Sequence, residues 1–73
     1  MSEISFQQAK KLTLDRLNQW LLELPVSERN RPRIVIDFKT YSVNDLIVQV
    51  ERETVVGKDY IYKTAKQGNY VVT

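Results

Sequence analysis

The sequence predicts an α+β fold in which a long N-terminal amphipathic helix packs on a small antiparallel sheet. Apolar residues recur at helical spacing over residues 5–24, apolar and polar residues alternate over residues 34–39, and two β-rich runs flank a glycine in residues 59–73. With 73 residues the chain has room for one core, so residues 1–73 are predicted to form a single small domain.

The composition excludes several classes of site. The sequence contains no cysteine and no histidine, which rules out disulfides, zinc sites built on thiolate or imidazole, and catalytic triads that use imidazole. The segment Gly57-Lys58-Asp59 lacks the earlier glycine and the hydroxyl residue of a phosphate loop. We therefore expect a protein that is not an enzyme, with no cofactor, no metal and no small-molecule substrate.

The chain is expected to be cytoplasmic and to make no contact with membranes. Its apolar runs are far shorter than the roughly 20 residues that cross a bilayer. Its first residues also lack the basic stretch and the following apolar stretch of a signal peptide.

Residues 5–24 are predicted to form the long helix. Ser5 and Gln8 have the spacing of a capping box at its start, and Pro25 ends it. At about 100° per residue, seven apolar side chains fall on one side of this helix, which is predicted to cover the sheet. These side chains are Phe6, Ala9, Leu14, Leu17, Trp20, Leu21 and Leu24.

Two leucines of this helix, Leu12 and Leu22, lie off its apolar side. Lone leucines are common on protein surfaces, so an ordinary exposed face also explains them. Val48 would occupy the polar side of a helix over the later segment 43–53. We predict that Leu12, Leu22 and Val48 contact a protein partner or a second copy of the chain.

Residues 25–33 are predicted to form a polar linker, and residues 34–39 a strand with one buried face. The linker contains two prolines and three arginines. In the strand, the apolar Ile34, Ile36 and Phe38 share one face. Asp37 is predicted to lie on the opposite face as an exposed carboxylate with no catalytic role.

Residues 43–53 fit either a helix or a strand. Ser42 is placed to cap a helix, and Asp45 lies where the helix dipole favours a negative charge. The run from Leu46 to Val50 is rich in β-branched residues, which favour strands. The capping signals favour the helix.

Residues 59–73 are predicted to form a hairpin. Two β-rich runs flank Gly68 and Asn69, and glycine adopts the positive φ that hairpin turns require. The competing interpretation is a helix from about Val55 to Lys66, which Gly57 would weaken.

The alternation of basic and aromatic residues in this tail raises nucleic acid as a candidate partner. Single-stranded nucleic acids bind positive grooves in which bases stack on aromatic side chains, and a hairpin would place Tyr60 and Tyr62 on one face. The arginines of the linker would add contacts to phosphates. The candidate residues are Arg29, Arg31, Arg33, Lys58, Tyr60, Tyr62, Lys63 and Lys66.

The leading hypothesis is nevertheless a small regulatory or accessory module that binds proteins and forms a homodimer. The net charge of +2 gives only weak long-range attraction for nucleic acid. A short chain without disulfides or metals also has a small core, and self-association is a common way to reinforce it. Nucleic-acid binding remains the alternative hypothesis.

Overall fold

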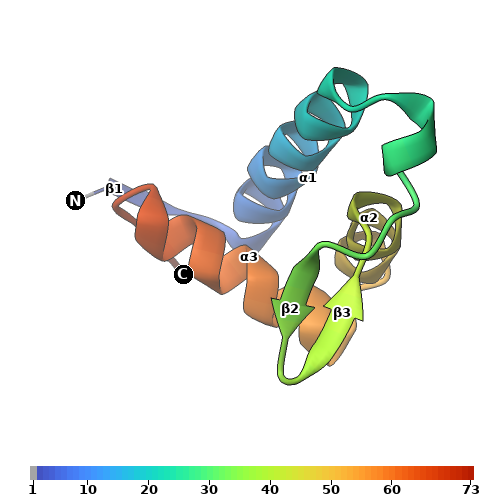
Figure 1. Ribbon diagram of the computed structural model, residues 1–73. Helices are drawn as coiled ribbons and strands as arrows, with labels where there is room; N and C mark the ends of the chain where they lie inside the picture. The colour runs from blue at the N-terminus through green and yellow to red at the C-terminus, as the bar shows by residue number, and fades with distance from the viewer. Residues whose placement is uncertain (1) are drawn as a thin grey trace.

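The computed structural model describes residues 2–73 and shows a mixed α+β fold (Figure 1). This confirms the predicted class, with a long first helix and a small antiparallel sheet. Among residues 2–73, none of the helices combines the length and the apolar composition that crossing a bilayer requires. In chain order the elements are β1 (Ser2–Ile4), α1 (Phe6–Glu23), a 3-10 helix (Val26–Glu28), β2 (Ile34–Ile36), β3 (Lys39–Tyr41), α2 (Val43–Glu51), α3 (Val55–Gln67) and β4 (Tyr70–Val72).

The first two α-helices begin at the residues that the sequence predicts. The Ser5 hydroxyl accepts a hydrogen bond from the Gln8 backbone N–H at 3.1 Å, and the Gln8 side chain accepts one from the Ser5 N–H. Ser42 and Asp45 form the same reciprocal box at the start of α2. These bonds satisfy donors that a helix start leaves unpaired, and they confirm that residues 43–51 form a helix.

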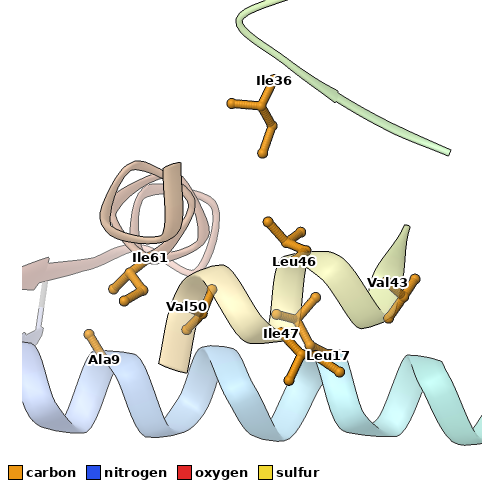
Figure 2. Close-up of a cluster of buried hydrophobic side chains, with 8 residues drawn as sticks. All are labelled: Ala9, Leu17, Ile36, Val43, Leu46, Ile47, Val50 and Ile61. Atoms are coloured by element: carbon orange, nitrogen blue, oxygen red, sulfur yellow. The ribbon is translucent and has the colours of Figure 1, made fainter. Parts of the chain in front are cut away.

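The core lies where α1, α2, α3 and β2 meet (Figure 2). In α2 the apolar residues occupy one helical face, and burying that face outweighs the strand preference of the β-branched residues. Figure 2 shows α2 lying along α1, with α3 approaching the end of α2 and β2 on the far side. The buried apolar cluster is Ala9, Leu17, Ile36, Val43, Leu46, Ile47, Val50 and Ile61.

The antiparallel sheet is the β2–β3 hairpin, in which Ile36 pairs with Lys39. The strand predicted over residues 34–39 therefore ends three residues early. Asp37 and Phe38 form a two-residue turn in which both have positive φ, 49° and 69°. The prediction that Asp37 lies on a strand face and Phe38 on the apolar face is wrong, because the chain reverses at these two residues.

The hairpin predicted over residues 59–73 is also wrong, because most of that segment belongs to α3. Ile61, Thr64 and Ala65 are buried at helical spacing, and the Thr54 hydroxyl caps the helix by accepting a hydrogen bond from the Gly57 N–H at 3.1 Å. Gly68 and Asn69 end the helix instead of turning a hairpin. The last strand, β4, pairs in parallel with β1, with Glu3 opposite Val71.

The linker over residues 25–33 is tied to neighbouring elements by hydrogen bonds. The Arg33 N–H donates to the Tyr41 carbonyl at 3.0 Å, next to the β2–β3 ladder. The Asn44 side chain donates to the Asn30 side chain at 2.8 Å, at the start of α2. The linker therefore fixes the base of the hairpin relative to the helices.

A single lysine joins α1 to the loop between α2 and α3. Lys10 Nζ donates to Glu53 Oε2 at 2.8 Å and to the Glu51 carbonyl at 3.0 Å. Glu53 has a φ of 53°, in the left-handed region that commonly ends a helix. The hydrogen bond from Lys10 lowers the pKa of the Glu53 carboxyl below its ordinary value.

Replacing Glu53 with glutamine is expected to remove part of the acid sensitivity of folding. Because folding depresses the Glu53 pKa, its contribution to stability is present above the unfolded pKa and is lost as pH falls through the folded pKa. Glu53→Gln should therefore be less stable than the parent at about pH 7, and this difference should be smaller at about pH 3, as measured by urea denaturation.

Glu51→Gln is the matched control for this pH experiment. The Glu51 side chain is exposed, and only its backbone carbonyl contacts Lys10. This variant should follow the parent at both pH values. A stability gap between Glu53→Gln and the parent that stays constant with pH would contradict the assigned role of the carboxylate.

Candidate functional site

The tip of the β2–β3 hairpin carries the most exposed aromatic side chain of the described residues. Phe38 has an exposed fraction of 102%, and Val35 on the preceding strand is 69% exposed. Figure 1 shows this turn at the periphery of the molecule, at the free end of the hairpin. We refer to residues Asp37 and Phe38 as the hairpin tip.

The backbone of the hairpin tip is strained as well as exposed. A two-residue turn with positive φ at both positions normally contains Asn-Gly or Asp-Gly. Asp37 suits the first position, but Phe38 stands where glycine is preferred, and a bulky residue in the left-handed region costs on the order of 1–3 kcal/mol. Residues that break local rules in this way are often found at functional sites.

An open groove of about 520 Å³ lies between α3 and β4. Helix α3 contributes Tyr62, Ala65 and Lys66 to its walls, and the chain from Asn69 to Val72 contributes the rest. Lys66 is the one charged residue among those that line it. We refer to this feature as the α3–β4 groove.

A second, smaller hollow of about 260 Å³ shares Tyr62 with this groove. It is lined by Phe6, Glu53, Lys58 and Tyr62. The rings of Phe6 and Tyr62 lie 6.0 Å apart between centroids, in a tilted arrangement. This contact orients the exposed Tyr62 ring, which lines both hollows.

The three residues predicted to contact a partner are all exposed. The exposed fractions are 44% for Leu12, 72% for Leu22 and 40% for Val48. Leu12 and Leu22 are separated along α1 by about 15 Å at the rise of an α-helix, so they do not touch each other. Val48 lies on α2, on the side away from the buried residues of that helix. Their role in binding stays a prediction.

The arginines of the linker are engaged by groups of the linker or of Leu24, the residue before it. Arg31 and Arg33 both pair with Glu28, at 3.1 and 3.0 Å. Arg29 Nε donates to the Leu24 carbonyl at 3.3 Å. The carboxylate offsets part of the positive charge that was predicted to attract phosphates.

The basic and aromatic residues of the tail are divided between different sides of α3. Tyr60 is half-buried, and burial raises the pKa of its hydroxyl, whereas Tyr62 is exposed. The prediction that Tyr60 and Tyr62 share a face is wrong, because two residues of a helix that are two positions apart point in nearly opposite directions. Lys63 pairs with Asp59 at 3.0 Å, while Lys58 and Lys66 line the two hollows.

The hairpin tip and the α3–β4 groove were not predicted from the sequence. Phe38 fitted the apolar alternation of a strand, and the turn lacks the glycine that would signal it. The one available signal was Asp37, a residue that tolerates the left-handed region. The groove depends on α3 and on the β1–β4 pairing, and both were absent from the predicted hairpin.

The hairpin tip and the α3–β4 groove offer a binding partner apolar surface and isolated charged side chains. Within residues 2–73 no cluster of three or more acidic side chains is arranged to hold a metal ion, and no buried side-chain polar atom lacks a hydrogen-bond partner. No protein-family model matches the chain, and searches of curated proteins and of solved structures found no match. The function is therefore inferred from the geometry of the chain itself.

Proposed function

We propose that this chain is a small, non-enzymatic protein-interaction module that self-associates and serves a regulatory or accessory role. The observation that carries the proposal is the full exposure of Phe38 on a strained turn. The turn costs stability in the isolated chain, and the exposed ring gains nothing from the hydrophobic effect. Contact with a protein surface would bury the ring and so supply the hydrophobic stabilisation that the isolated chain lacks.

The hairpin is well built for such a contact. Ile36 anchors it in the core, and the bond between Arg33 and Tyr41 closes its base. A tip that is already ordered loses less conformational entropy on binding than a mobile loop would. Burying a phenylalanine side chain stabilises by about 1.5–3 kcal/mol, which is a large share of a weak interaction.

Exposed apolar residues on the helices support the same proposal. Leu12, Leu22 and Val48 would widen the contact beyond the tip. Protein binding is favoured over nucleic-acid binding because Arg31, Arg33 and Lys63 already form ion pairs within the chain. Tyr60 packs against the core, which leaves less of its ring for stacking on a base.

The proposal predicts that Phe38→Gly changes self-association and stability in opposite directions. Sedimentation velocity from about 10 μM to about 1 mM should show the parent as a dimer or larger and the variant as a monomer. The variant should also gain about 1 kcal/mol in unfolding free energy, because glycine suits the positive φ. A change that merely damaged the fold would lower both quantities.

Two further variants complete this experiment. Val26→Ser removes another exposed apolar side chain, outside the hairpin, and should leave association unchanged. Leu12→Glu combined with Leu22→Glu tests whether the helix surface takes part and should weaken the assembly if it does. A parent that stays monomeric at about 1 mM would refute the proposed self-association.

A further inference from the structure

The α3–β4 groove has the size and the lining to accept an aromatic side chain. A closed cavity of about 150 Å³ is enough to hold a benzene ring. The groove measures about 520 Å³ and is open to solvent, and the residues that line it include Tyr62, Ala65 and Tyr70. Aromatic rings in contact with one another gain about 0.5–1.5 kcal/mol beyond the burial of their area.

Charge distinguishes this groove from an ordinary apolar depression. Lys66 is its one charged residue, and its ammonium group forms no ion pair with any residue in 2–73. When a side chain enters the groove, a carboxylate on the neighbouring residue of the same segment can therefore pair with the free ammonium group of Lys66. The groove thus favours an aromatic residue with an acidic neighbour.

The hairpin tip has this composition. Asp37 directly precedes Phe38, and its carboxylate forms no ion pair among the described residues. Lys63 is held by Asp59 at 3.0 Å, and this hydrogen bond raises the pKa of Lys63, with a smaller contribution from Asp37. Phe38 is fully exposed, so the tip does not occupy the groove of its own chain.

We propose that the hairpin tip of one copy of the chain inserts into the α3–β4 groove of a second copy. Phe38 enters between Tyr62 and Tyr70, and Asp37 pairs with Lys66. This inference rests on the proposed self-association and identifies the two surfaces that make it. Because the tip and the groove are different surfaces, the contact either closes as a reciprocal pair or ring, or continues as a chain of copies.

Charge reversal on each side of this contact tests the inference. Asp37→Lys places a lysine opposite Lys66, and Lys66→Glu places a glutamate opposite Asp37. Each variant alone should associate about tenfold more weakly than the parent in sedimentation velocity. An equimolar mixture of the two restores opposite charges at the contact and should return the association to near the parental level.

A labelled mixture locates the contact directly. When unlabelled Asp37→Lys is added to ¹⁵N-labelled Lys66→Glu, NMR amide shifts should appear around Tyr62 and Tyr70. Lys11→Glu makes the same change in charge as Lys66→Glu on an exposed residue of α1, and it should associate as the parent does. The recovery in the mixture also shows that both variants fold.

The possible outcomes separate the two proposals. If both charge variants associate like Lys11→Glu while Phe38→Gly abolishes association, the tip docks elsewhere, and the inference fails while the proposed function stands. Amide shifts confined to α1 around Leu12 and Leu22 would overturn the inference in the same way. If the parent itself is monomeric at about 1 mM, the proposed function fails first.

Discussion

Replacing Gly57 with alanine is expected to lower the free energy of unfolding by about 3 kcal/mol or more, or to prevent folding. A Cβ atom at this position would overlap the Gln49 carbonyl oxygen, and it would lie 2.5 Å from the Gln49 carbonyl carbon and 2.8 Å from the Val50 nitrogen. All three atoms belong to the backbone of α2, so no side-chain rotation relieves the clash.

The clash also falls at a hydrogen-bonded junction. The Gln49 carbonyl accepts a hydrogen bond from the Thr54 N–H at 3.2 Å, and this bond sets the turn between α2 and α3. Moving α3 away from α2 would disturb that turn and the burial of Ile61 and Val50. A domain of this length has on the order of 4–11 kcal/mol of total stability, so the expected loss is a large part of it.

Gly68→Ala is the matched control. A Cβ at Gly68 would lie 2.6 Å from a ring carbon of Tyr70, a side chain that can rotate away, and we expect a loss of about 1 kcal/mol or less. Helix propensity alone predicts that Gly57→Ala raises the free energy of unfolding by about 1 kcal/mol, whereas the backbone clash predicts that it falls. A urea denaturation midpoint for Gly57→Ala at or above that of Gly68→Ala would contradict the close approach.

The parts of the fold that were predicted correctly are those specified by neighbouring residues. Ser5 with Gln8, and Ser42 with Asp45, satisfy helix donors within one turn, so their spacing in the sequence is enough to locate the start of a helix. The error at α3 arose because Tyr60, Tyr62 and the β-branched residues around them imitate a strand. The contact between Gly57 and α2, which allows the helix, cannot be seen in sequence.

The parallel pairing of β1 with β4 was beyond prediction for a related reason. It joins residues 2–4 to residues 70–72, and each strand has only three residues. Strands this short show almost no alternation of apolar and polar residues, and their pairing depends on where α1 and α3 position them. The α3–β4 groove was missed together with this pairing, whereas the exposure of Leu12, Leu22 and Val48 followed from helical periodicity alone.

Shortening a buried side chain of α2 is expected to destabilise the fold, and Leu46→Ala is the most sensitive test of this expectation. Leu46 is fully buried, and Figure 2 shows the Ile36 side chain of β2 pointing toward it. Leu46→Ala removes three carbon atoms from a closed core and should cost about 2–5 kcal/mol in urea denaturation. Ile36 is the one buried residue of the β2–β3 hairpin, so the hairpin should loosen as well.

Hydrogen exchange can separate this local loosening from the global loss of stability. In Leu46→Ala the amides of β2 and β3 should lose more protection than those of α1, because the hairpin has one buried residue, Ile36, whereas α1 is buried at Ala9, Thr13 and Leu17. Val48→Ala, an exposed truncation on the same helix, should stay within about 0.5 kcal/mol of the parent. If Leu46→Ala and Val48→Ala reduced the protection of the hairpin amides equally, Leu46 would not join the hairpin to the helices. The linker would then hold the tip that bears Phe38.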